Sequence, residues 1–366
     1  MIEKEKISNR QVILLVNVFI SSTAIIYLPT VVYNEAKQDG WMTFILFGLM
    51  GIIVASIVTS LGIMFKDKTI VEYSEVILGK IPGKVIGLIL FLFFISINAI
   101  IIREFCELLI TSYSSNTPAH FFSIAIIILS IYALYSGIEV IARTNEIIFP
   151  LFAIAILSIV FLSIREMDFK NLTPILAEGF IPVLKGFYAQ ILFASEIFIL
   201  SMLMPYINEP EKVRRSSIIT MTIITGLAIL ITIGMVAVLG DEIGHLHYPF
   251  LTFARYVNVR NVFERIESLV IALWVAGVFI KIALYHYCGV MVFAQVFHFK
   301  NYKKLIIPMG VLLVFLSQII FKNDAQFYEL IHHGIKFPFT CIQVGIPIFL
   351  LIIAKVRKKA IKKKTG

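Results

Sequence analysis

The stretch Ile191-Leu192-Phe193-Ala194-Ser195-Glu196-Ile197-Phe198-Ile199-Leu200 places a serine and a glutamate inside the mostly apolar segment 182–205. A second apolar segment, 11–34, contains Ser21-Ser22-Thr23 ahead of Pro29. Hydrocarbon offers no partner to a carboxylate or to an unpaired backbone N–H or C=O group, so an interrupted helix persists only where it faces protein or a water-filled cavity. We therefore expect two discontinuous helices whose polar breaks mark the functional centre.

The composition around these segments is that of a polytopic membrane protein. Hydrophobic residues make up 59% of the 366 positions, charged residues only 15%, and the mean hydropathy is +0.93, which lies outside the range of soluble globular domains. No linker or soluble block of domain size interrupts the apolar runs, so we expect one all-α integral membrane domain over 1–366. Runs long enough to cross a bilayer predict about ten transmembrane helices: 11–34, 42–65, 85–111, 119–136, 146–164, 182–205, 216–239, 264–297, 305–321 and 336–355.

The charge distribution predicts the orientation. Most of the 32 Lys and Arg residues fall in the two tails and in the loops on the side of the termini. By the positive-inside rule, the tails 1–10 and 356–366 are then cytoplasmic. The basic C-terminal tail accounts for much of the net charge of +9, and it is typical of an anchor against anionic membrane lipid rather than of a nucleic-acid-binding segment.

The two interrupted spans are the first and the sixth of the ten. A chain built as two inverted halves of five spans, each half opening on a discontinuous helix, has this spacing. No sequence repeat is visible between the halves, so the expected 5+5 arrangement depends on the position of the breaks.

Several motifs resemble one known family, the permease-like B subunits of bacterial spore nutrient germinant receptors. The likeness extends over nearly the whole chain. That family is in turn similar to the amino acid-polyamine-organocation superfamily, so the resemblance implies the leucine-transporter fold of five plus five inverted spans. The motifs are Gly137-Ile138-Glu139-Val140-Ile141-Ala142-Arg143-Thr144-Asn145-Glu146, Ile102-Arg103-Glu104-Phe105 with Thr117-Pro118, Asp39-Gly40-Trp41, Phe263-Glu264-Arg265-Ile266-Glu267 with Trp274, and Asn171-Leu172-Thr173-Pro174.

The resemblance implies a function as well as a fold. Its members sense a small nutrient in the inner membrane of the dormant spore, together with a partly soluble A subunit and a lipoprotein C subunit. This sequence departs from the family where Ser21-Ser22-Thr23 stands in place of the glycine that relatives commonly carry in span one. The three hydroxyls satisfy freed backbone groups, but they leave the backbone less open to a ligand than glycine does.

The candidate ligand-binding residues begin at the two breaks. Ser21, Ser22 and Thr23 are placed to donate hydrogen bonds to a ligand carboxylate at a half-helix end, although Ser and Thr also commonly bond back to their own helix. On span six, Phe193, Ser195 and Glu196 are candidates. An intramembrane glutamate needs a partner, a proton or water, so Glu196 either binds an ammonium group, titrates during switching, or forms a structural pair.

Two further spans supply the remaining candidates. Lys281 on span eight lies one helical turn from Tyr285 on the same face. In the related fold, span eight faces the break of span one, so the Lys281 ammonium is placed to occupy a cation site, to meet a ligand carboxylate, or to pair with Glu196. Phe93 and Ile97 of span three share a face, and the fold makes that span another wall of the cavity.

Other polar groups are assigned to architecture or gating, and no metal site is expected. Arg103 lies near the membrane boundary, where neighbouring charges usually form structural pairs. Glu139 and Arg143, at i, i+4 in a short cytoplasmic turn, pair with each other if the turn is helical, and they match the family motif, which makes them a candidate docking or gating element. His245 and His247 have no accompanying ligand set, so no metal is predicted there.

The predicted function is therefore binding without catalysis. The sequence contains no nucleotide-binding loop, nucleophile elbow, zinc-protease motif or dinucleotide fingerprint, so we expect neither enzymatic activity nor a cofactor. A small metabolite, with an amino acid as the expected class, binds between spans one and six and shifts the bundle between two arrangements. A proton-coupled amino-acid transporter and an ion-channel subunit of the receptor are the alternatives.

Overall fold

A computed structural model of the chain describes residues 6–112, 116–256, 266–321, 326 and 330–365, with the side chains of 266–269, 331–333 and 358–365 excepted. The glutamate and arginine that open the predicted span eight, at 264 and 265, lie outside the described residues. So do the side chains of most of the basic C-terminal tail. Within the described chain the regular structure is helical, in α, 3-10 and π segments, apart from one bridge between Ile7 and Ile207.

The long helices match the predicted spans closely in position. Shorter helical turns connect them: η1 (Lys37–Asp39), α3 (Ile70–Leu78), η2 (Ser163–Glu166), η3 (Phe169–Leu172), η6 (Pro210–Lys212), η7 (Gly240–His245), α10 (Pro249–Tyr256) and the π-helical η8 (Leu330–Ile335). The uninterrupted long helices are α1 (Asn9–Ala36), α2 (Gly40–Met64), α4 (Lys80–Ser112), α5 (Ala119–Ser136), α6 (Ile138–Leu162), α9 (Val213–Leu239), α11 (Ile266–Val296) and α12 (Lys303–Ile319). The sixth span is made of α7 (Ile181–Ala194), η4 (Glu196–Ile199), α8 (Leu200–Leu203) and η5 (Met204–Tyr206). The last span is made of α14 (Lys336–Thr340), the π-helical η9 (Cys341–Gly345) and α15 (Ile346–Thr365).

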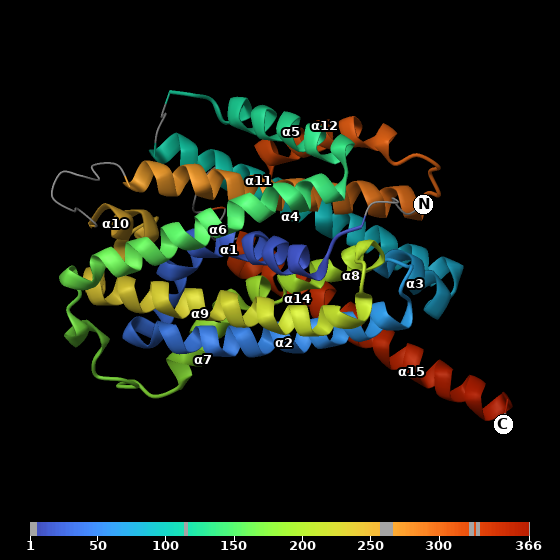
Figure 1. Cartoon of the computed structure of the whole chain (residues 1–366), viewed down its shortest axis with the longest axis horizontal. Helices are drawn as coiled ribbons and strands as arrows, with labels where there is room; N and C mark the ends of the chain where they lie inside the picture. The colour runs from blue at the N-terminus through green and yellow to red at the C-terminus, as the bar shows by residue number, and fades with distance from the viewer. Residues whose placement is uncertain (1–5, 113–115, 257–265, 322–325, 327–329, 366) are drawn as a thin grey trace.

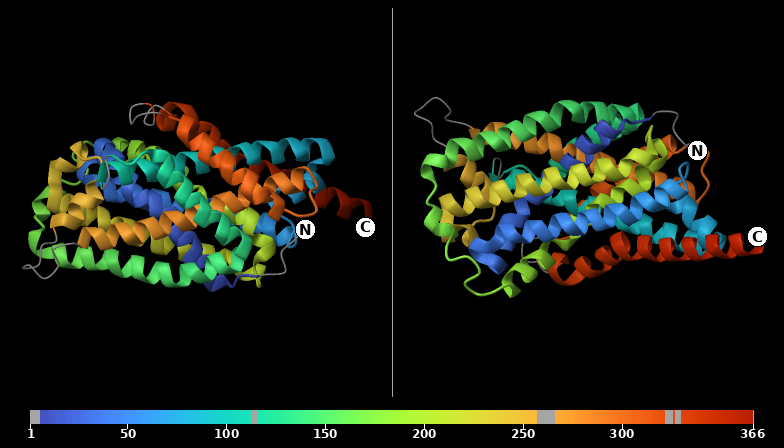
Figure 2. Two further views of the ribbon diagram at one scale, coloured as in Figure 1. Left: turned by 90° about the horizontal axis from the view of Figure 1, so that it is seen from above. Right: turned by 60° about the horizontal axis from the view of Figure 1, so that its bottom comes forward.

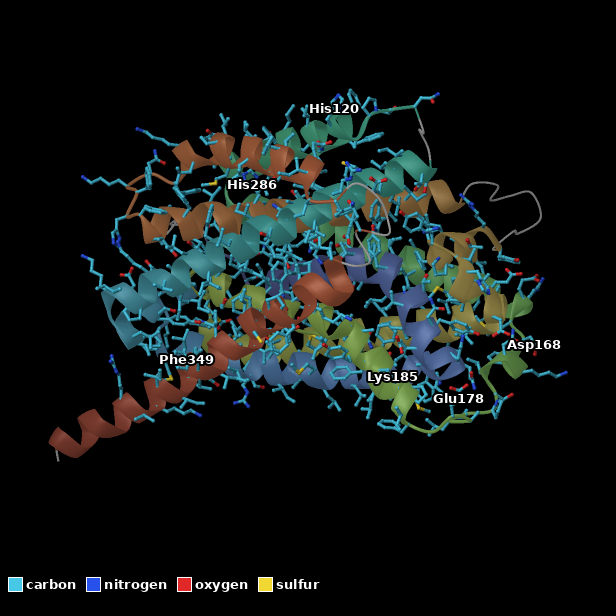
Figure 3. All side chains as sticks on the ribbon, turned by 180° about the vertical axis from the view of Figure 1, so that it is seen from behind. His120, Asp168, Glu178, Lys185, His286 and Phe349 are labelled. Carbon is cyan, nitrogen blue, oxygen red and sulfur yellow. The ribbon has the colours of Figure 1, made fainter. Side chains whose placement is uncertain are left out.

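The protein is a multi-pass membrane protein. Eight helical stretches of the described chain are long and apolar enough to cross a bilayer, and the first, Asn9–Met64, contains both α1 and α2. The helices are consistent with ten spans, although that count stays a prediction. Figures 1 and 2 show that α1 begins and α15 ends toward the same end of the bundle, while Figure 3 shows Asp168 and Glu178 at the opposite end.

The helices pack in the pairs that two inverted halves require. The most extensive contacts between long helices include α2 with α9, α4 with α11, α5 with α12 and α1 with α7. In a 5+5 repeat these are the second, third, fourth and first helices of each half against their counterparts. The packing is therefore consistent with the predicted internal symmetry.

The sixth span is interrupted, as predicted. Its α-helix ends at Ala194, and Ser195 adopts φ −89° and ψ −4°, close to the bridge region. A 3-10 turn over Glu196–Ile199 and a four-residue helix follow. The side chains of Ser195 and Glu196 both find partners on other helices, which satisfies the polar groups of the break within the protein.

The predicted break in the first span is wrong. α1 is one uninterrupted α-helix of 28 residues that includes Ser21-Ser22-Thr23 and Pro29. None of these three residues is a glycine, and serine and threonine hydroxyls are compatible with continuous helix in a membrane. Proline is likewise tolerated in transmembrane helices. Only the second half of the repeat therefore opens on a discontinuous helix.

The hairpin between α3 and α4 depends on a close approach at Gly83. A Cβ at this position would lie 2.5 Å from the Cα and 2.6 Å from the backbone nitrogen of Glu75. Since backbone cannot swing aside, Gly83→Ala should lower the free energy of unfolding by about 1–3 kcal/mol. The control is Gly226→Ala on α9, where a Cβ meets nothing within 4 Å and helix propensity favours alanine. Thermal unfolding in detergent tests this, and equal midpoints for the two variants would contradict it.

Candidate functional site

The centre of the bundle contains a buried ion pair between Lys281 and Glu196. The Lys281 ammonium donates to both carboxylate oxygens of Glu196 at 2.8 Å and to Thr23 Oγ1 at 2.6 Å. Lys281 is completely buried and Glu196 is 4% exposed. Residues from α1, the break of the sixth span and α11 therefore meet at one point, and Thr23, Glu196 and Lys281 are among the candidates named from the sequence.

Aromatic rings enclose the ammonium group. The Lys281 Nζ atom lies 5.1 Å from the centre of the Phe19 ring and 5.7 Å from that of Phe193, distances typical of cation–π attraction. The Tyr285 hydroxyl donates to Glu196 Oε1 over a long 3.5 Å, and its ring packs 4.8 Å from that of Phe19. These contacts, with an exposure of 0% for Lys281 and 4% for Glu196, hold both charged groups in the interior.

The three hydroxyl residues of α1 face three different directions. Thr23 meets Lys281, whereas the Ser22 carbonyl accepts a hydrogen bond from Trp274 Nε1 at 2.6 Å. The Ser22 hydroxyl is buried without a hydrogen-bond partner among the described residues. Ser21 lines a small cavity of about 40 Å³ between α1, α2, α6 and α9. Consecutive helical residues are about 100° apart, so one face of α1 brings only Thr23 to the pair.

Phe93, Ile97 and Ser195 make no hydrogen bond, ion pair or ring contact with Lys281 or Glu196 among the described residues. Phe93 packs edge-on against Phe198, with ring centres 6.1 Å apart, and Ile97 is buried on the same face of α4. Ser195 points elsewhere, because its hydroxyl donates to Gln343 Oε1 at 2.5 Å. That bond connects the break of the sixth span to the π-helical part of the last one.

The residues assigned to architecture form pairs on their own helices. Arg103 pairs with Glu107 at 2.5 Å within α4. Glu139 and Arg143 form an exposed ion pair, and the predicted turn that carries them is the first part of α6. None of these three residues is brought to the Lys281–Glu196 pair.

Three residues near the pair were not selected from the sequence. Phe19 lies one turn before Thr23 on α1, so the spacing could have found it. Trp274 lies two turns before Lys281 on the same face of α11. Glu104 lies three turns after Phe93 on the same face of α4, and its side chain is buried, at 6% exposed. Glu104 was not selected because it stands with Arg103 and Glu107 in a cluster of charges, and such a cluster is typical of structural pairs near the membrane boundary.

Comparison with known proteins assigns the family. A family model described as "Spore germination protein" matches residues 6–325. The chain belongs to the spore germination protein family. Among its relatives in Bacillus subtilis, Spore germination protein KB is 27% identical over 377 residues, covering 100% of this chain and 98% of the relative. Spore germination protein YndE is 25% identical over 364 residues, covering 98% of each.

Solved transporter structures share the fold of this family member. MhsT in complex with L-phenylalanine aligns with a TM-score of 0.69 at 15% identity, over 95% of this chain and 89% of that one. A Na+-coupled sialic acid symporter aligns with a TM-score of 0.65 at 16% identity, over 91% and 78%. Both show that the chain has the leucine-transporter fold.

Two larger cavities of this spore germination protein lie toward opposite ends of the bundle. One of about 600 Å³ is lined by α3 and the C-terminal end of α11. The other, of about 300 Å³, lies between Thr111 and Ser112 of α4 and the segment from Leu246 to Arg255. Neither lining includes Lys281 or Glu196, so the charged pair is closed off from both in this arrangement.

The different directions of the α1 hydroxyls give a prediction. Thr23→Val keeps the side-chain shape but removes the oxygen that accepts from Lys281, so it should lower the free energy of unfolding by about 1.5–3 kcal/mol, the range for hydrogen bonds to charged groups. Ser21→Ala should change it by less than about 0.5 kcal/mol, as expected away from such contacts. Thermal unfolding of both variants is the test. An equal shift for Ser21→Ala would contradict the assignment of Thr23 as the hydroxyl that holds the ion pair.

Proposed function

We propose that this chain is the nutrient-sensing subunit of a spore germinant receptor. It lies in the inner membrane of the spore with both termini in the cytoplasm. It binds a small metabolite, an amino acid, beside Glu196 and Lys281, and it signals without catalysis to partner A and C subunits. The observation that carries this proposal is the buried ion pair that bridges the break of the sixth span and α11.

The chemistry of the pair matches a zwitterion. An α-amino acid carries one ammonium group and one carboxylate. Lys281 and Glu196 supply the same two groups to each other in the ion pair. The ligand ammonium would take the Glu196 carboxylate, and the ligand carboxylate would take the Lys281 ammonium. MhsT, which shares the fold, was solved with L-phenylalanine, and this supports an amino acid as the ligand class.

The signal then follows from the separation of the pair. Here Lys281 holds Glu196 directly, which fixes the break of the sixth span against α11. A ligand that inserts between them must favour the arrangement in which the two helices stand apart, since equal affinity for both arrangements would shift nothing. Partner subunits that contact the rearranged helices would receive the change.

The test is a nutrient panel on spores that lack this chain. We expect the deletion to abolish germination with at least one L-amino acid and the wild-type chain to restore it. A variant carrying both Lys281→Met and Glu196→Gln should reach normal abundance without restoring the response. Germination of the deletion strain with every nutrient of the panel would refute the sensing role.

A transport assay separates the two alternatives. Proteoliposomes with the purified chain should bind the active amino acid without accumulating it. Accumulation driven by a proton gradient would instead establish a proton-coupled transporter, and a nutrient-triggered ion current would establish a channel subunit.

A further inference from the structure

The cavity of about 600 Å³ between α3 and the end of α11 is lined by charges of both signs. Lys68 precedes α3 and Lys80 begins α4, while Glu72 and Glu75 share one face of α3. Together they contribute two ammonium groups and two carboxylates, so the charges lining the cavity balance. Buried apolar side chains complete the lining: Val71, Met291 and Ala294.

The four charged side chains are not paired with one another. No ion pair joins any of them within the part of the chain that the structure describes, whereas the nearby Lys66 pairs with Glu211. One oxygen of Glu72 accepts from the Thr69 backbone N–H at 2.9 Å, as part of the cap of α3. For the Glu75 carboxylate, no hydrogen bond is found among the described residues. Both ammonium groups and one carboxylate are therefore available to a ligand.

The walls of the cavity are fixed by close contacts between three helices. Thr69 Oγ1, at the start of α3, donates to Gln295 Oε1 of α11 at 2.7 Å. On α4, a Cβ at Gly87 would lie 2.4 Å from a methyl group of Val296 and 3.3 Å from one of Val71. Because α3, α4 and α11 pack this tightly, the cavity is largely preformed, as ligand sites usually are.

The cavity opens where the lipid-facing surface meets the end of the bundle. Exposed apolar side chains lie on all three helical segments around it: Val76 of α3, Ile81 and Val85 of α4, and Phe297 and Phe299 after α11. Val76 and Phe299 also line the cavity itself. Exposed aromatic side chains are typical of the membrane interface, and α3 lies toward the end of the bundle where α15 ends (Figure 1). The charges therefore lie at the level of the lipid headgroups.

A zwitterionic phospholipid headgroup matches these charges. The headgroup of phosphatidylethanolamine carries one negative phosphate and one primary ammonium group, which donates hydrogen bonds. Phosphatidylglycerol has no cation for a carboxylate, so it would place a negative charge beside Glu72 and Glu75. Phosphatidylcholine has a cation, but its methylated nitrogen has no N–H group to donate.

We propose that this cavity binds the headgroup of phosphatidylethanolamine, with the phosphate at Lys68 and Lys80 and the ammonium group at Glu75. The acyl chains lie along the exposed apolar side chains beside the cavity. The bound lipid connects α3 to the end of α11. Since neither Lys281 nor Glu196 lines this cavity, the inference is independent of the nutrient and goes beyond the proposed sensing function.

Native mass spectrometry of the purified, delipidated full chain tests the proposal. The chain is titrated with phosphatidylethanolamine, phosphatidylglycerol and phosphatidylcholine that have identical acyl chains. We expect phosphatidylethanolamine to bind about tenfold more tightly than the other two, as one additional hydrogen bond to a charged group implies. Equal affinity for the three lipids would overturn the proposal whether or not any variant folds. Displacement of the lipid by an equal concentration of soluble phosphoethanolamine would also overturn it, because the site would then belong to a soluble metabolite.

Two substitutions test the assigned contacts. Glu75→Gln should abolish the preference for phosphatidylethanolamine over phosphatidylcholine, whereas Glu211→Gln, the control with an exposed carboxylate outside the cavity, should keep it. Lys80→Gln should weaken binding of all three lipids, whereas Lys84→Gln, one turn further along α4 and outside the lining, should not. An unchanged preference in Glu75→Gln, or equal effects of the two lysine variants, would contradict the site.

Discussion

Lys281→Ala is expected to lower the free energy of unfolding by about 3–5 kcal/mol, because it removes one partner of a buried charge pair and leaves the other. The remaining carboxylate of Glu196 is 4% exposed and keeps only the long bond from Tyr285. Thermal unfolding in detergent and the amount of protein in membranes should both report the loss.

The variant that combines Lys281→Met with Glu196→Gln should recover most of that stability. Two neutral side chains of similar shape replace the pair, and such replacements are often neutral or stabilising. Lys66→Ala is the control, since its ion pair with Glu211 is about half exposed and exposed pairs contribute roughly 0–1 kcal/mol. If Lys281→Ala unfolds no earlier than Lys66→Ala, the pair does not hold the centre together.

Trp274→Ala is expected to have an effect of the same size, about 3–5 kcal/mol, because it empties a large, buried site. Trp274 is 2% exposed, stacks on Phe105 and donates to the Ser22 carbonyl. Its removal should therefore loosen α1 and α4 from α11 together. The midpoint of thermal unfolding is the measurement.

Trp274→Phe separates the ring from the hydrogen bond. It keeps most of the stacking but removes the indole donor, while the Ser22 carbonyl keeps its bond within α1, so the loss of one hydrogen bond should destabilise by about 0.5–1.5 kcal/mol. The control is Trp41→Phe, since Trp41 lies half-buried at the start of α2. An equal effect of the two phenylalanine variants would show that the indole N–H does not anchor α1.

The fold was predictable because its signal lies in long apolar runs. Each predicted span overlaps a helix of the described chain, and the break at Ser195-Glu196 appears where a carboxylate in hydrocarbon requires a partner. Pairing of Glu196 with Lys281 was one of the open alternatives. The sequence could not decide it, because either group could have met a ligand instead.

The continuity of α1 and the position of Glu104 were not predictable for different reasons. Hydroxyl side chains are compatible with a broken helix and with a continuous one, so Ser21-Ser22-Thr23 does not distinguish the two. The burial of Glu104 depends on how the helices pack, because only the contact of α4 with α11 shows which charge of its cluster faces inward.

Equilibrium binding of labelled L-amino acids to the purified chain tests the central claim most directly, when the wild type is compared with the variant carrying Lys281→Met and Glu196→Gln. We predict saturable binding of at least one amino acid by the wild type and none by the folded double variant. Undiminished binding by that variant would contradict the placement of the nutrient site at this ion pair.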